Sequence, residues 1–237
     1  MPVSLHLADD LPTADLSALA DEVFAWLRAV DERFSTYKAD SEVSRLARGE
    51  LRREECSPDL THVLDRCAEL WQATDGYFDA YAAGSFDPSG YVKGWAVQVA
   101  TDRLVAAGSV NHWLNAGGDI RLHGRPAPGR AWRIGIQHPF QPQRLAWVLT
   151  GTDLAVATSG TYARGLHVID PFTGAPADEL CSVTVVGPDL CLADAYATAA
   201  LAMGRRGLDW LAKLDGYESA VVTAVGEAYR SPGLPVA

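Results

Sequence analysis

The first regular pattern in the chain is a stripe of apolar residues with polar residues between them. Leu16, Leu19, Val23, Leu27 and Val30 recur at steps of three and four. Because one helical turn takes 3.6 residues, these side chains share one face, and the pattern predicts an amphipathic helix over residues 15–34. Capping residues and apolar spacing predict three more helices, over residues 41–46, 57–76 and 89–108.

After Gly108 the pattern changes to short apolar runs separated by turn residues, which is typical of strands. The predicted strands cover residues 113–114, 120–122, 132–136, 145–150, 155–158 and 182–186. Two more helices are expected over 192–203 and 208–214, followed by a hairpin of 220–224 with 227–229 and a loose tail from 231. Helices first and strands later predict an α+β fold with mixed or antiparallel sheets flanked by helices. We expect a single domain over residues 1–237, helix-rich over 1–108 and strand-rich over 109–237.

Composition narrows the classes of function. The 237 residues are 48% hydrophobic and 21% charged, which is ordinary for a soluble protein. The net charge of −10 comes without any basic stripe, so a nucleic-acid partner is not expected. No apolar run approaches the about 18 residues that span a bilayer, and the N-terminus lacks a signal pattern, so we expect no membrane insertion and a cytoplasmic location. Four cysteines without C-x-x-C spacing predict reduced thiols rather than a zinc site.

Asp194 and Thr198 lie four residues apart on a predicted helix, so their oxygens project from one face. A carboxylate and a hydroxyl are hard ligands that suit Mg²⁺, which completes its octahedron with substrate phosphates and water. The structural alternative is an acidic residue favouring the helix dipole and a threonine bonding back to a carbonyl. Taken alone, the pair favours this alternative.

Three further segments offer groups that suit an anion. Gly117 and Gly118 stand between predicted strands and allow close backbone approach, or simply a tight hairpin turn. The run 158–160, Thr-Ser-Gly, offers hydroxyls and N–H groups at a strand end, or a polar turn. Lys93 follows Gly90 at the start of a helix, where a phosphate binds readily; the alternative is a solvated surface lysine.

His167 is the one histidine with a suggestive setting. It precedes a short predicted strand over 168–170 that a Pro-Phe-Thr-Gly turn ends. It could donate to a developing phosphate charge or take a proton from a nucleophile, or it could simply bond a backbone carbonyl. Tyr37, in a polar loop beside Phe34, could stack on a flat ring or cap the core. No G-x-S-x-G, HExxH, GxGxxG or Walker A pattern is present, which argues against a serine triad and other common sites.

Together, in this order, the segments resemble the FAD:protein FMN transferase (ApbE-like) family. The strongest stretches are Lys93-Gly94, Gly117 to Asp119, Thr158 to Gly160, His167 to Gly174, and Asp194 with Thr198. The resemblance covers residues 35–204. It implies an ApbE-like fold and an enzyme that binds FAD and Mg²⁺, transfers FMN to a Thr or Ser hydroxyl of an acceptor protein, and releases AMP. Some members of the family instead hydrolyse FAD to FMN and AMP.

The resemblance also implies roles for individual residues. Asp194, Thr198 and a carbonyl near Val92 would be metal ligands, and His167 and Asp194 are the candidate catalytic residues. Lys93 and Ser159 would face the phosphates or the ribityl chain, and Tyr37 the isoalloxazine. The full set expected to bind the flavin cofactor is Tyr37, Ser41, Lys93, Gly117, Gly118, Asp119, Thr158, Ser159, Gly160, His167 and Val168.

The chain departs from the family pattern at four places. The segment 78–87 is compressed, and Ala47, Gln98 and Ala163 replace an asparagine, an aspartate and an acidic residue. These changes concern the FAD wall and the adenine side, while the expected metal and phosphate residues remain. Two alternatives therefore stand beside the transferase: an FAD pyrophosphatase and a flavin-binding module without turnover.

Overall fold

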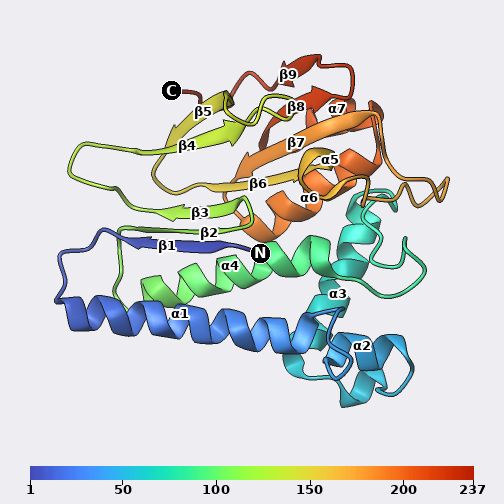
Figure 1. Cartoon of the computed structure of the whole chain (residues 1–237), viewed down its shortest axis with the longest axis horizontal. Coiled ribbons are helices and arrows are strands. Elements are labelled where there is room, and N and C mark those ends of the chain that lie inside the picture. The colour runs from blue at the N-terminus through green and yellow to red at the C-terminus, as the bar shows by residue number, and fades with distance from the viewer.

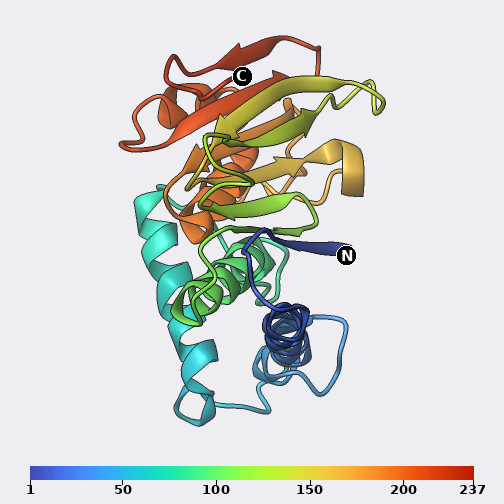
Figure 2. The same cartoon turned by 90° about the vertical axis from the view of Figure 1, so that its left-hand side faces the viewer.

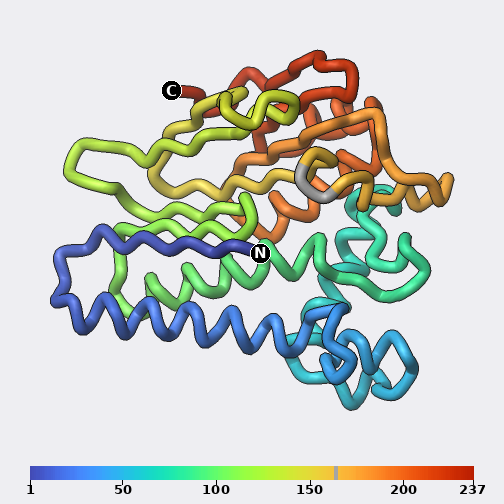
Figure 3. The backbone as a smooth tube through the Cα atoms, viewed as in Figure 1, coloured from blue at the N-terminus to red at the C-terminus, as the bar shows by residue number. Residues whose placement is uncertain are grey.

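The structure is a computed structural model that describes residues 1–162 and 165–237 (Figure 3). In these residues one antiparallel sheet has the strand order β1-β2-β3-β6-β7-β8-β9, and β4 and β5 form a separate two-stranded sheet (Figure 1). The strands are β1 (Val3–Leu7), β2 (His112–Ala116), β3 (Asp119–His123), β4 (Trp132–Gln137), β5 (Leu145–Gly151), β6 (Ala155–Gly160), β7 (Leu180–Gly187), β8 (Glu218–Thr223) and β9 (Ala228–Arg230). The helices are α1 (Thr13–Phe34), α2 (Glu42–Ala47), α3 (Pro58–Ala73), α4 (Ser89–Ala106), α5 (Thr161–Arg164), α6 (Leu190–Ala202) and α7 (Arg206–Leu211), with a 3₁₀ turn, η1 (Arg53–Glu55).

Helices cover one face of the large sheet in two layers. α4 and α6 pack on each other and on β2, β3, β6 and β7, and α1 packs on the outside of α4 (Figures 1 and 2). α1 turns Val23, Trp26, Val30 and Phe34 inward, and the Trp26 indole donates to the Ala96 carbonyl at 2.9 Å. The apolar stripe predicted from the sequence is therefore the face that joins α1 to the core.

The opposite face of the sheet is covered by β4 and β5. Ile134, Ile136 and Leu149 pack there against Leu122 and Val186 of the large sheet. The C-terminal segment joins this layer, since Thr150 N donates to Pro235 O at 2.8 Å and Leu234 is buried. The prediction of a loose tail is therefore wrong: one buried leucine and backbone pairing with β5 hold a segment whose composition resembles a free end.

Most predicted elements are present within a few residues of the expected bounds, and the α+β fold is confirmed, with all strand pairs antiparallel. Two local differences stand out. β1 was not predicted, although Val3, Leu5 and Leu7 alternate with polar residues as an edge strand requires. The strand predicted over 168–170 is reduced to a single bridge between Ile169 and Pro176, because the proline turn folds the segment back at once.

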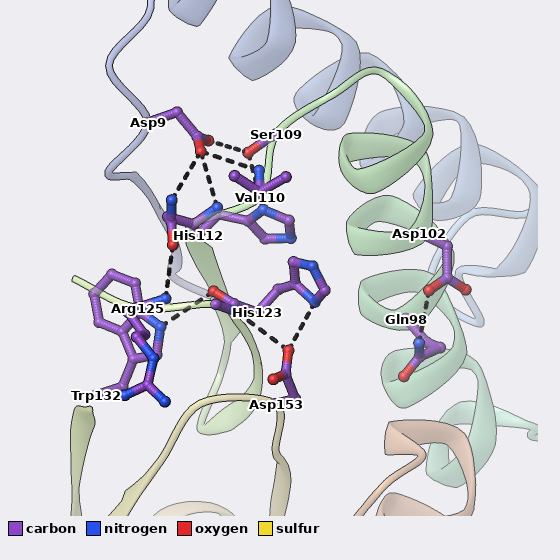
Figure 4. Close-up of polar contacts among 12 residues, drawn as sticks. Asp9, Gln98, Asp102, Ser109, Val110, His112, His123, Arg125, Trp132 and Asp153 are labelled. Atoms are coloured by element: carbon purple, nitrogen blue, oxygen red, sulfur yellow. Dashed lines mark hydrogen bonds and ion pairs between the residues drawn. The ribbon is translucent and has the colours of Figure 1, made fainter. Parts of the chain in front are cut away.

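Asp9 fastens the N-terminal segment to the loop that follows α4. Its carboxylate accepts from the Ser109 hydroxyl and from Val110 N and Asn111 N at 3.0 and 2.9 Å (Figure 4). Because the Ser109 hydrogen goes to Asp9, the 2.9 Å contact between Ser109 Oγ and His112 Nδ1 makes the His112 ring the donor. Burial, helped by neighbouring His123, lowers the pKa of His112 to about 4.

All four cysteines are free thiols. Among the described residues, none of the helices is both long and apolar enough to cross a membrane.

Candidate active site

A cleft of about 490 Å³ opens at the ends of β6 and α4, and its size is in the range of small-molecule sites. The loops after α1 and α3, the β2–β3 turn and the segment after α5 complete its walls. It brings together most of the residues predicted from the sequence, namely Tyr37, Lys93, Gly117, Gly118, Thr158, Ser159, Gly160, His167, Val168, Asp194 and Thr198. Segments far apart in the chain thus meet in one place, as their ordered resemblance implied.

Lys93 lies at the centre of the charged wall. Its ammonium forms an ion pair with Asp119 and a second with Asp194 Oδ1, at 3.0 Å. The other oxygen of Asp194 accepts from Gly94 N at 2.9 Å. Asp119 and Asp194 are both buried, whereas the Lys93 side chain keeps 17% of its surface exposed and reaches the cleft. The alternative of a solvated surface lysine is therefore wrong.

Close packing of α4 on α6 makes this arrangement possible. A Cβ on Gly94 would come within 2.6 Å of Leu190 O and 2.9 Å of the Asp194 Cβ, closer than a side chain tolerates. Asp189 caps α6 by accepting from Leu192 N at 2.9 Å. The two helices can therefore approach until the Asp194 carboxylate reaches the α4 backbone.

The donor set fits a hard divalent cation. Thr198 Oγ1 lies one helical turn after Asp194 and 3.1 Å from Ser159 Oγ, so a carboxylate and two hydroxyls share one side of the cleft. Mg²⁺ commonly takes only one or two protein carboxylates and fills the remaining positions with phosphate and water oxygens. Within the described residues no cluster of three or more His, Cys, Asp or Glu side chains that could hold a metal ion is found.

The glycine turn is a hairpin and also part of the cleft. Gly117 and Gly118 join β2 to β3 with φ of +63° and +105°, values that L side chains rarely adopt. Gly118 N donates to Asn115 Oδ1 at 2.9 Å, and both glycines line the cleft. Asp119 follows at once, and its Oδ1 accepts from Thr158 N at 3.3 Å. The turn thus links the cleft to the carboxylate that holds Lys93.

His167 stands on the open side of the cleft and is exposed. Its Nδ1 contacts Gly165 O at 3.0 Å, and since a carbonyl only accepts, Nδ1 carries the hydrogen in the neutral ring. Nε2 is then the basic nitrogen. The imidazole is therefore prepared to accept a proton from a group that enters the cleft.

Aromatic residues that sequence reasoning overlooked complete the open side. Tyr77, Phe78 and Tyr162 line the cleft beside Tyr37, which is 98% exposed. Tyr77 packs against Phe172 with ring centroids 4.8 Å apart. The aromatic run that begins at Tyr77, directly after the end of α3, was the available signal for this wall.

Three predicted residues do not line the cleft. Ser41 is buried and caps α2, accepting from Ser44 N at 3.1 Å and donating to Ser35 O at 2.7 Å. Val92 is buried within α4, and Asp119 is buried behind Lys93. Gln98, one of the departures from the family pattern, joins α4 to α6, since its side-chain carbonyl accepts from Leu190 N at 3.2 Å. Ala163 lies outside the described residues.

Comparison with known proteins identifies the family. A model of the ApbE family matches residues 1–85 and 82–221, most of the chain. The chain belongs to the ApbE family. Among curated ApbE relatives, an FAD:protein FMN transferase of Vibrio cholerae is 39% identical over 133 residues, which cover 52% of this chain and 40% of the relative. One of Haemophilus influenzae is 25% identical over an alignment of 264 positions, which covers 84% of this chain and 76% of the relative. The chain thus matches less than half the length of the Vibrio cholerae relative.

Solved structures of ApbE proteins share the fold. The flavin transferase ApbE from Vibrio cholerae superposes with a TM-score of 0.82 and 27% identity, over 97% of this chain and 93% of that one. The ApbE protein of Thermotoga maritima gives a TM-score of 0.80 over 97% of this chain and 92% of that one, at 21% identity, so it bears on the fold alone. The resemblance predicted from the sequence is confirmed.

Proposed function

We propose that this chain is a Mg²⁺-dependent FAD:protein FMN transferase that moves FMN from FAD to a Thr or Ser hydroxyl of an acceptor protein and releases AMP. The observation that carries the proposal is the cleft itself, where a lysine, an aspartate with a threonine one turn later, and a histidine with a basic Nε2 face one space. The curated relatives are named FAD:protein FMN transferases, which supports it.

The charged wall suits the diphosphate of FAD. Lys93 offers positive charge and the Ser159 hydroxyl a possible donor to phosphate oxygens, and the turn at Gly117 and Gly118 lines the same cleft. Asp194 and Thr198 would hold Mg²⁺, which when bound would neutralise phosphate charge during transfer. On the open side, Tyr37 and Tyr77 offer flat faces to the isoalloxazine ring.

His167 is proposed as the base. The acceptor oxygen forms a bond to the FMN phosphorus, the bond from that phosphorus to the AMP oxygen breaks, and AMP leaves with the electron pair. The proton of the acceptor hydroxyl moves to His167 Nε2. Exposure of His167 fits a nucleophile that arrives on another protein.

The same exposure favours one alternative, because water can reach His167 as readily as a hydroxyl side chain can. Hydrolysis would give FMN and AMP from the same cleft. A flavin-binding module without turnover is the third possibility.

We further propose that the chain acts as a single domain in the cytoplasm, and its four free thiols support the cytoplasmic location.

AMP release from FAD tests the proposal, measured by chromatography with and without Mg²⁺ and with and without a threonine-containing acceptor peptide whose mass is followed. Mg²⁺-dependent AMP with a peptide that gains one FMN is the expected result. AMP and free FMN with an unlabelled peptide would favour hydrolysis. Bound FAD without any AMP would favour the binding module.

A further inference from the structure

Lys93 holds two carboxylates of different kinds. Asp194 lines the cleft, whereas Asp119 is fully buried and does not line it. The ammonium contacts both. One cation is therefore shared between a carboxylate that faces the ligand space and one that lies behind it.

Both oxygens of Asp194 already receive donors: Oδ1 takes the Lys93 ammonium at 3.0 Å and Oδ2 takes Gly94 N at 2.9 Å. A Mg²⁺ ion would bond a carboxylate oxygen at about 2.0–2.1 Å. At that distance from Oδ1 the ion and the ammonium would be neighbours, and two cations repel strongly in a buried site. Metal and ammonium at Oδ1 together would therefore repel each other, and binding of one weakens binding of the other.

We infer that Lys93 is a tethered cation that competes with the divalent metal for Asp194, and that Asp119 retains the ammonium when the metal enters. The inference rests on the proposed function, which assigns the metal to Asp194 and Thr198. Asp119 is then a positioning residue: it never meets the substrate, and it acts by deciding where the Lys93 ammonium lies.

The structure around Asp119 suits this task. Thr158 N donates to Asp119 Oδ1 at 3.3 Å, and residue 119 is fixed at the start of β3, paired with Ala116 of β2. The carboxylate is therefore anchored to the sheet, while the ammonium is carried by a flexible four-carbon stem. Released from Asp194, Lys93 stays at the cleft, where it can meet a phosphate.

The double variant K93M/D119N tests the competition. It removes one positive and one negative charge, so net charge alone predicts no change in metal affinity. Methionine preserves the apolar stem, and the amide carbonyl introduced at position 119 can still accept from Thr158 N. Competition predicts that MgCl₂ titrated into FAD-free protein by calorimetry binds about tenfold more tightly to the double variant than to the parent chain, or about 1.4 kcal/mol.

The single variants move in opposite directions. K93M should bind Mg²⁺ more tightly, and D119N should bind it more weakly because the ammonium is then held more firmly by Asp194. K93M leaves Asp119 buried without its cation and is the one at risk of unfolding, which the double variant avoids. Adding T198V to the double variant should abolish the increase in Mg²⁺ affinity. That result would show that the more tightly bound Mg²⁺ lies at Asp194 and Thr198.

The inference is overturned if the double variant is folded by circular dichroism yet binds Mg²⁺ no more tightly than the parent chain. It is also overturned if no variant shows measurable Mg²⁺ binding. These outcomes are independent of the transferase reaction, because no FAD is present: AMP release by the parent chain with unchanged metal affinity in the double variant would reject only the competition. Tighter binding in the double variant without any AMP release would reject only the transferase.

Discussion

The two walls of the cleft are built in different ways. One wall holds Lys93, Asp194 and Thr198, on the long helices α4 and α6, together with Ser159 of β6, and each has polar contacts with other parts of this wall. Tyr37 and His167 line the cleft from loops, after α1 and after α5, and both are exposed; we call this the open wall. The groups proposed to handle charge are thus held by contacts with one another, whereas those proposed to face the flavin ring and the acceptor are exposed on loops.

The difference suits the proposed chemistry. Phosphoryl-type transfer depends on prearranged charge, so its groups belong on rigid elements. An acceptor that is itself a protein needs an accessible approach, which an exposed His167 provides. We call the wall of Lys93, Asp194, Thr198 and Ser159 the rigid wall. Variants of the rigid wall are expected to abolish the reaction. Variants of the open wall are expected to change its rate or its substrate affinity while the fold stays intact.

The largest effect is expected from Asp194→Ala. Mg²⁺-dependent AMP release should fall by about a thousandfold, or about 4 kcal/mol, because the only proposed carboxylate ligand is lost. The protein should remain folded, since Lys93 keeps Asp119 as its partner. AMP release at saturating FAD across a Mg²⁺ titration checks this, with the thermal unfolding midpoint measured beside it.

Asp209→Ala, which removes a carboxylate from α7 outside the cleft, is the matched control and should release AMP at the parent rate. Unchanged AMP release in Asp194→Ala would remove the metal from this wall. It would also remove the contrast between the walls, since a carboxylate with partners on both oxygens would then have only a structural role.

Acid should weaken the sheet that supports the rigid wall. The pKa of His112 is lowered from 6.5 to about 4 in the folded protein, first by burial and then by His123. Between these values the unfolded chain binds a proton that the folded one does not. The free energy of unfolding should therefore fall by about 3 kcal/mol as the pH drops from 6.5 to 4, measured by urea unfolding at several pH values.

The variant His112→Gln should flatten this pH dependence, because its neutral amide has nothing to protonate. His138→Gln, in the β4–β5 connection, is the matched control and should keep the slope. An equally steep slope in His112→Gln would assign the acid sensitivity to other groups.

The rigid wall was also the better predicted one, for a physical reason. Asp194 and Thr198 are four residues apart on a helix, so their shared face follows from helical geometry, and the Gly117-Gly118 turn follows from glycine's freedom at positive φ. The ion pair of Lys93 with Asp119 joins two elements that are separated in the chain. It depends on how α4 packs against β3, which no local pattern encodes.

The open wall was predicted less well because loops carry no periodic signal. Tyr77 and Phe78 line the cleft, although the sequence indicated only a compressed segment over 78–87 and no role for Tyr77. Ser41 has the residue type and position of a ligand contact, yet its hydroxyl is used to cap α2. A serine before a short helix fits both roles, and only its burial in the structure distinguishes them.

A smaller effect is expected from His167→Ala. The rate of FMN transfer should fall by about a hundredfold, in the range of general base catalysis, while the dissociation constant for FAD changes little. Single-turnover transfer to the acceptor peptide gives the rate, and flavin fluorescence gives the affinity. His138→Ala should leave both at the parent values. Equal losses in rate and affinity would make His167 a binding residue, and the open wall would then bind without taking part in the chemistry.

The smallest effect is expected from Tyr37→Ala, on the most exposed aromatic residue of the cleft. An aromatic contact contributes about 0.5–1.5 kcal/mol, so the dissociation constant for FAD should rise by about two- to tenfold. The thermal unfolding midpoint should not move, because the ring covers no core. Tyr229→Ala on β9 removes another exposed ring, and should leave FAD affinity unchanged. Parent-like FAD affinity in Tyr37→Ala would shift recognition of the ring to Tyr77 and the deeper aromatic residues, and the flavin side would then be better ordered than its loops suggest.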